Sequence, residues 1–303
     1  MAMIEERGAV DVTVDVVIHM ILGLVALMCL VPFVHLAAVS LSATTPVATN
    51  QVWLWPVGFN VDNYLYIFRS DRTFLGCMLT SVERVLVGVS VGLLISIITA
   101  YPLSRDNIQM PGRVAIKTLI IFGMMFNAGF IPYFLSLRNL GLLDKFAVLI
   151  LPGAFNVFNT ILIMNYFRGL PNEIYESAVL DGASHLQVLF RVFLPVSQPV
   201  LATVTLFSTV SHWNSWFDGF VFLRHVDQWP LQSYLYGRVI LKQIEQMAAR
   251  EAAHGTVSAG LSEISPEALS NAMVFVTMVP IMLVYPFLQR YFVTGLTLGA
   301  VKE

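Results

Sequence analysis

Carboxylates and a glycine mark the longest region between apolar spans that still has a strong helical pattern, residues 171–195. Glu173 and Glu176 follow Pro171 closely, so a helix that begins there has negative charge beside the positive end of its dipole. Gly182 then allows a backbone conformation that other residues resist. A second short helix is predicted from apolar residues at helical spacing: Leu186, Leu189, Phe190 and Phe193. From the residues alone, this is an amphipathic helix–turn–helix, too short and too polar to span a bilayer, that can lie at a membrane surface.

The other chemistry-bearing residues form no catalytic pattern. The sequence contains no phosphate-binding loop of the Gly-Lys-Ser/Thr type, so the chain cannot be the nucleotide-hydrolysing part of an ATP-driven machine. The six histidines are scattered, and neither a metal cluster nor a nucleophile–base arrangement is evident. Cys29 and Cys77 lie in or beside apolar spans, and we expect both to be small buried hydrophobic side chains. The prediction is a protein that is not an enzyme and has no cofactor of its own.

The composition is that of a polytopic membrane protein. Hydrophobic residues make up 57% of the chain and charged residues 12%, whereas soluble domains carry roughly 25% charged residues. The net charge of −2 argues against nucleic acid as a partner. A bilayer core needs about 20 apolar residues per helix. The sequence therefore predicts an all-α membrane protein whose six transmembrane helices contact membrane lipid. The six stretches that qualify are 16–40, 81–103, 114–137, 146–167, 197–217 and 272–293.

An even number of spans places both termini on one side of the membrane. Lys and Arg residues are divided equally between the two sides, eight and eight, and only the short loop that contains Arg105, Arg113 and Lys117 favours the cytoplasm for the side of the termini. The first span is too long for a signal-peptide core, so we expect an uncleaved anchor. We divide the chain into this anchor helix with the first outer loop, residues 1–74, and a core of five transmembrane helices, residues 75–303.

Part of the 171–195 stretch resembles the EAA loop of ABC-importer permeases. The family pattern is Glu-Ala-Ala, three residues, Gly, nine residues, Ile, one residue and Leu-Pro. This sequence has Ser in place of the first Ala and Val in place of Ile, both small changes. The surrounding residues and the tail 289–302 are similar to the carbohydrate branch of these permeases, and several segments resemble its oligosaccharide subgroup. The matching residues are Glu176-Ser177-Ala178, Gly182, Val192 and Leu194-Pro195.

This resemblance implies the type I ABC importer permease fold, with a cytoplasmic coupling helix that docks into an ATP-hydrolysing subunit. Glu176 and Asp181 would make polar contacts to that subunit, and Gly182 would form the turn. The implied partners are a second permease subunit, two ATP-binding subunits that carry ATP and magnesium, and an extracytoplasmic solute-binding protein. The implied location is the bacterial cytoplasmic (inner) membrane, with both termini in the cytoplasm. The implied coupling residues are Glu173, Glu176, Ser177, Ala178, Asp181, Gly182, Ala183, Leu194 and Pro195.

Two groups of residues in the predicted spans are candidates for a substrate path. The first group consists of amides, Asn127, Asn156 and Asn159, which must be satisfied in a bilayer and can either hold helices together or contact substrate. The second group combines aromatic faces with a hydrogen-bonding amide, as a sugar site requires: Trp213, Asn214 and Trp216. The alternative for the second group is an interfacial aromatic belt. For Glu83 and Arg84, near the outer end of the second span, we expect interfacial or interhelical contacts.

The outer loop predicted at residues 219–270 is longer than a simple connection needs. Its aromatic residues Trp229, Tyr234 and Tyr236 are candidates for docking a binding protein, and a helical run is expected at 243–253. The alternative is a solvated loop with one surface helix. We therefore expect a permease subunit of an ATP-driven importer for a sugar, in particular an oligosaccharide. The alternatives are a permease for a non-sugar solute such as a phosphorylated polyol, or an ATP-independent secondary transporter.

Overall fold

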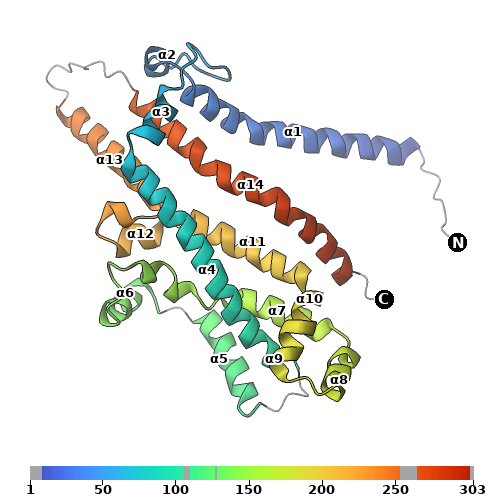
Figure 1. The fold of residues 1–303 in the computed structure, drawn as a ribbon. Coiled ribbons are helices and arrows are strands. Elements are labelled where there is room, and N and C mark those ends of the chain that lie inside the picture. Colours follow the sequence, from blue (N-terminus) through green and yellow to red (C-terminus); the bar gives the residue numbers. More distant parts are fainter. Residues whose placement is uncertain (1–8, 106–109, 127, 253–264, 301–303) are drawn as a thin grey trace. The chain divides into compact units, whose positions relative to one another are not determined.

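The computed structural model describes residues 9–105, 110–126, 128–252 and 265–300. The regular elements in these ranges are helices (Figure 1). The chain divides into two compact units, of which one comprises Met1–Arg72 with Gly255–Met278 and the other Thr73–His254 with Val279–Glu303. The division into residues 1–74 and 75–303 that we drew from the sequence stays a prediction.

The first unit begins with a long apolar helix, α1 (Ala9–Ser40), whose side chains are exposed over residues 13–34. It continues with α2 (Thr44–Ala48), α3 (Asp62–Arg69) and the start of α14 (Pro266–Ala300). The side chain of Asn63 donates a hydrogen bond to the carbonyl of Ser40 at 3.1 Å, and the hydroxyls of Ser40 and Tyr64 lie 2.7 Å apart. Burial raises the pKa of Tyr64. The small core of this unit consists of Ala38, Val39, Val47, Val52 and Ala268.

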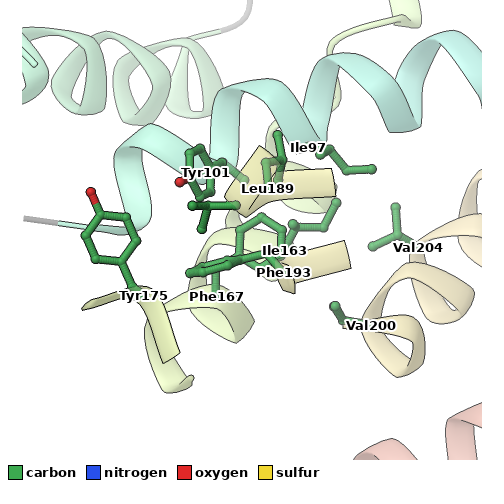
Figure 2. Close-up of a cluster of buried hydrophobic side chains, with 11 residues drawn as sticks. Ile97, Tyr101, Ile163, Phe167, Tyr175, Leu189, Phe193, Val200 and Val204 are labelled. Atoms are coloured by element: carbon green, nitrogen blue, oxygen red, sulfur yellow. The ribbon is translucent and has the colours of Figure 1, made fainter. Parts of the chain in front are cut away.

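The second unit begins with α4 and holds the largest buried cluster (Figure 2). Its α-helices are α4 (Arg72–Ser104), α5 (Arg113–Met125), α6 (Phe130–Asn139), α7 (Val157–Gly169), α8 (Asn172–Leu180), α9 (His185–Gln187), α10 (Leu194–Val196), α11 (Gln198–Asn214), α12 (Phe217–Phe222) and α13 (Leu231–Ala252), followed by the remainder of α14. Three short 3₁₀ turns are η1 (Phe146–Leu149), η2 (Leu151–Gly153) and η4 (Val226–Gln228), and η3 (Val188–Phe193) is a π-helix.

The predicted all-helical membrane architecture is confirmed. Within the described ranges, α1 (from Thr13), α4 and Pro266–Val284 of α14 are long and apolar enough to cross a bilayer. Three bent helix pairs bring the number to six if each pair is one span: α5 with α6, η1–η2 with α7, and α9–α10 with α11. The last two pairs bend by 45° at residues 154–156, shortly after Pro152, and by 82° at Ser197, between Pro195 and Pro199. Proline favours such breaks because it removes a backbone donor and crowds the preceding turn.

Several local expectations differ from the structure. The predicted fifth span, 197–217, stops at Asn214, because Ser215 is extended and a new helix starts at Phe217. The predicted loop at 219–270 contains α13, which begins at Leu231, well before the helical run expected at 243–253. Pro171 lies one residue before α8 as its cap.

The prediction for the cysteines was right for one of them only. Cys77 is buried in α4, and its thiol donates to the carbonyl of Val226 at 3.3 Å. Cys29 is exposed, as are all the residues of α1 from 13 to 34. This part of α1 needs an apolar neighbour, since its exposed apolar side chains have bilayer length.

Candidate functional site

The helix–turn–helix segment, residues 171–195, is built by two complementary helix ends. At the end of α8, the N–H of Ala183 donates to the carbonyl of Ala178 and the N–H of Gly182 donates to that of Val179, both at 3.0 Å. This is the Schellman arrangement, which requires a left-handed residue directly after the cap. Gly182 supplies that residue with φ of +78°.

The next helix starts with a capping box that sequence reasoning missed. The hydroxyl of Ser184 accepts the N–H of Gln187 at 3.4 Å, and the Gln187 side chain accepts the N–H of Ser184 at 2.8 Å. The spacing Ser-x-x-Gln is the signal that could have revealed it. The two helix ends therefore confine the flexible part of the turn to residues 181–183.

The second half of the segment is held by an aromatic core. Figure 2 shows Phe193 of the π-helix beside Tyr101 of α4 and Phe167 of α7, with ring centroids 5.2 Å and 5.4 Å from that of Phe193. Tyr175 is buried in the same cluster and brings α8 against it. Such edge-to-face contacts stabilise by about 0.5–1.5 kcal/mol each beyond the area they bury. The segment is consequently packed onto the ends of α4 and α7.

A buried arginine adds polar links at the same place. Arg105, directly after α4, donates to the carbonyls of Phe167 and Leu170 at 3.0 Å and 2.9 Å, and to the side chain of Asn172. Its guanidinium lies 5.1 Å from the centre of the Phe193 ring. Burial lowers the pKa of Arg105. From the sequence, Arg105 was predicted only as one of the positive charges of a short loop.

The residues proposed for coupling fall into two groups in the structure. Ala178, Ala183 and Leu194 pack against the aromatic core. The polar residues are exposed, together with Gly182 and Pro195: Glu173, Glu176, Ser177 and Asp181. Two apolar residues accompany them on the surface, Leu180 at 87% exposed and Leu186 at 66%. Tyr175 is the residue of α8 that is buried in the aromatic core. The exposed group is a mixed acidic and apolar surface suited to protein contact.

A cavity of about 410 Å³ lies in the second unit between α4, η1–η2, α7 and α11. This volume falls within the range of small-molecule sites. Its walls combine the aromatic rings of Tyr133, Phe158 and Phe207 with hydroxyls and amides. The polar lining residues are Arg84, Asn156, Asn159, Ser208, Ser211, His212, Ser215 and Asp218.

An ion pair closes one side of this cavity. The guanidinium of Arg84, whose side chain is 3% exposed, pairs with the Asp218 carboxylate and donates to the carbonyl of Ser215 at 3.3 Å. The Ser215 hydroxyl donates to Asp218 at 3.0 Å. The two charges of the pair balance each other. The Asp218 side chain is 29% exposed and that of Arg84 is 3% exposed, so the carboxylate is the more accessible of the two groups. For Arg84 the structure shows an interhelical contact, as expected for this charge.

The predicted substrate residues are brought together only in part. Asn156 and Asn159 both line the cavity, where Asn159 donates to the Ser208 hydroxyl at 3.0 Å and Asn156 caps α7. Trp213 is buried on another face of α11, and Asn214 does not line the cavity. Trp216 stacks on Tyr236 with ring centroids 3.9 Å apart. Asn127 lies outside the described residues.

Sequence reasoning missed several cavity residues. His212 packs against Gly88, where an added Cβ would stand 2.7 Å from the imidazole ring. Asp218 also lines the cavity and is not among the predicted substrate residues. Gly88 lies one turn from Arg84 on α4, and this spacing of a small residue and a charge within a span was the available signal.

The residues proposed for docking a binding protein have packing roles in the structure. Trp229 donates from Nε1 to the carbonyl of Leu223 at 2.9 Å. Tyr234 is buried and accepts a hydrogen bond from Arg238 at 3.1 Å. Tyr236 is half-buried under Trp216. These contacts shape the start of α13, and docking by the three aromatic residues stays a prediction.

The comparisons with known proteins agree with this geometry. Residues 92–298 match the family described as "Binding-protein-dependent transport system inner membrane component". The polygalacturonan/rhamnogalacturonan transport system permease protein YtcP of Bacillus subtilis (strain 168) is 36% identical over 288 residues, covering 95% of this chain and 98% of that protein. Protein LplC of the same bacterium is 37% identical over 289 residues, covering 95% and 94%.

A solved structure is similar over nearly the whole chain. It is the crystal structure of a bacterial ABC transporter involved in the import of the acidic polysaccharide alginate. The match has a TM-score of 0.83 at 32% identity and covers 94% of this chain and 98% of that chain. The family match extends over more than half of the residues, and both the curated relatives and the solved structure cover nearly all of them. The chain therefore belongs to the family of inner-membrane components of binding-protein-dependent transport systems.

Proposed function

We propose that this chain is the permease subunit of an ATP-driven importer that moves an oligosaccharide across the cytoplasmic membrane. The observation that carries the proposal is the cavity of about 410 Å³, with aromatic walls and placed hydroxyls and amides. Sugars offer C–H faces to rings and hydroxyls to hydrogen-bonding groups, and this lining offers both. The permease named for polygalacturonan and rhamnogalacturonan and the transporter structure for alginate support a carbohydrate substrate.

The energy for transport enters through the helix–turn–helix segment. Its exposed carboxylates and apolar residues dock on an ATP-hydrolysing subunit, which carries ATP and magnesium. Two such subunits, a second permease subunit and an extracytoplasmic binding protein complete the importer. This arrangement places the segment and both chain termini in the cytoplasm. The docked segment has different contacts in the two states of the ATPase, and this difference drives the cavity between outward and inward access.

The substrate that we expect first is an oligosaccharide that contains acidic sugars. The alginate transporter is 32% identical to this chain and covers 94% of it. Within the cavity lining the charges of Arg84 and Asp218 balance each other. A substrate carboxylate would therefore compete with Asp218 for the guanidinium, whereas a hydroxyl can bind to the pair as it is. Comparing the transport of neutral and acidic oligosaccharides of equal length distinguishes binding through carboxylates from binding through hydroxyls.

The test is reconstitution of the complete importer in proteoliposomes with its binding protein. We expect oligosaccharide-loaded binding protein to stimulate ATP hydrolysis and labelled sugar to enter with it. If a phosphorylated polyol stimulates ATP hydrolysis and none of the sugars does, the proposed oligosaccharide substrate is wrong. Uptake by this chain alone, driven by an ion gradient without ATP, would contradict the mechanism and indicate a secondary transporter.

A further inference from the structure

Arg105 joins three elements that meet below the aromatic core. Its two carbonyl acceptors, Phe167 and Leu170, belong to the last turn and cap of α7. The Phe167 carbonyl also accepts the N–H of Leu170 at 3.3 Å, and the guanidinium adds a second donor to it and a donor to the carbonyl at the cap, where helical partners run out. The third acceptor is the side chain of Asn172, the first residue of α8. One side chain therefore ties the end of α7 to the start of α8.

The same arginine is attached to the end of α4. Arg105 follows Ser104, the last residue of this helix, and is 4% exposed. The stack on Phe193 extends the connection to the π-helix, so that both halves of the helix–turn–helix segment touch one guanidinium. Arginine at a carbonyl-rich, aromatic site of this kind is not replaceable by lysine, which lacks the planar fork.

The other end of the link is the cavity. Arg84, Gly88 and Gly92 of α4 line it. At 1.5 Å per residue, Arg84 lies about 30 Å along the helix from Arg105. α4 is one helix from Arg72 to Ser104, with Pro102 in its last turn, and a rigid helix of this length can carry displacement from one end to the other. In Figure 1, α8, α9 and α10 lie near the C-terminal end of α4, which Arg105 directly follows.

We propose that Arg105 is a positioning residue for energy coupling, which delivers movement of α8 to α4 and thereby to the cavity. This inference rests on the proposed function, in which the ATPase displaces α8. Removal of the guanidinium leaves the ATPase docking surface intact, because the exposed carboxylates and leucines do not contact Arg105. ATP hydrolysis and cavity opening should then separate.

The test uses the complete importer with a reporter in the cavity. Cys29 and Cys77 are replaced by serine, and Ser211, an exposed cavity residue, is replaced by cysteine. The rate at which a maleimide reacts with this cysteine is measured without nucleotide and after trapping with ATP and vanadate. We expect the rate to change with ATP in the parent. In Arg105→Gln the ATP-dependent change should be lost while the ATPase still co-purifies and hydrolyses ATP.

Two further variants keep the test decisive if Arg105→Gln does not assemble. Arg105→Lys keeps the charge and loses the fork, and Asn172→Ala removes only an exposed acceptor, so both should assemble and respond less than the parent. Arg138→Gln, which removes an exposed charge at the end of α6, is the matched control and should respond fully.

The outcomes separate the inference from the function beneath it. A parent-like response in Arg105→Gln, or in both milder variants where that one does not assemble, would overturn the role of Arg105 and leave the importer assignment standing. A parent complex whose reporter does not respond to ATP would contradict the proposed coupling itself, and the inference with it.

Discussion

At the scale of single residues, Gly182 is the position where backbone conformation matters most. Its φ of +78° is unfavourable for side chains with a Cβ, by about 1–2 kcal/mol for most residues. No other atom lies within 4 Å of an added Cβ, so space is not the constraint. We expect Gly182→Val to reduce ATP-driven transport roughly fivefold or more, since 1–2 kcal/mol changes a conformational ratio by that factor. Uptake by reconstituted importer measures this, with immunoblotting of the membrane fraction to show normal insertion.

The matched variant at this position is Gly182→Asn. Asparagine adds a side chain at this position but tolerates the left-handed region. Transport by Gly182→Asn should therefore stay near the parent value. Equal losses in the valine and asparagine variants would show that side-chain size at the docking surface, and not the backbone of the turn, decides the effect.

The Arg84–Asp218 pair makes a second prediction at this scale. Asp218→Asn leaves a guanidinium of 3% exposure without its carboxylate, and breaking a buried pair in this way costs about 3–5 kcal/mol. We expect a large drop in the thermal unfolding temperature in detergent. The double variant Arg84→Gln with Asp218→Asn should regain part of the loss, because no charge is then left unpaired. Additive losses of the single variants would mean that the two groups are not coupled.

The two residue sites differ in how far the sequence could predict them. The turn at Gly182 was predictable, because helix signals and a glycine lie within a few residues of one another. The Arg84–Asp218 pair joins residues 134 positions apart, and no local pattern indicates which of several charges meets which. Trp213 and Trp216 show the same limit, since their types fit a sugar site but the rotation of α11 and the break at Ser215 direct them elsewhere.

At the scale of elements, the approach of α4 to α11 depends on a glycine. An added Cβ at Gly88 would stand 2.7 Å from the ring of His212. We expect Gly88→Ala to destabilise the protein by about 1–3 kcal/mol through overpacking, visible as earlier thermal aggregation in detergent. Gly123→Ala in α5 is the matched control, because nothing lies within 4 Å of its added Cβ. There the helix propensity of alanine should raise stability by up to about 1 kcal/mol. Equal stability of the two variants would contradict close packing at Gly88.

The long helices were predictable because uninterrupted apolar runs of bilayer length have few alternatives. The bent pairs were not, because a bend depends on which of several prolines and caps acts. Asn156, read as a polar residue within a span, caps α7. The start of α13 was missed because its support is distant: the N–H of Leu231 donates to the Ser81 hydroxyl at 2.7 Å, and Leu231 is 1% exposed.

At the scale of the whole molecule, the apolar surfaces that remain exposed outside the spans indicate what has to cover them. Leu180, at 87% exposed, ends α8 within a segment too polar to span a bilayer, where lipid is not the expected neighbour. Burial of one leucine stabilises an interface by about 1.5–3 kcal/mol, which corresponds to roughly tenfold to a hundredfold in affinity. The membrane class and the family pattern were readable from the sequence, but this exposure was not, because it depends on which face of α8 packs against the aromatic core.

Leu180→Glu tests whether this surface docks the ATPase. A carboxylate in place of a buried leucine loses the apolar contact and must also be desolvated, so we expect the affinity for the ATPase to fall by at least about tenfold. Co-purification from detergent with a titration of added ATPase measures this, and the second permease subunit should be retained because α8 is not expected to contact it. Leu140→Glu, at a residue 71% exposed beyond α6, carries the same change on the surface away from α8 and should bind the ATPase as the parent does. Retained ATPase binding in Leu180→Glu would move the docking site away from the end of α8 and leave the carboxylates of the first turn as the remaining contact.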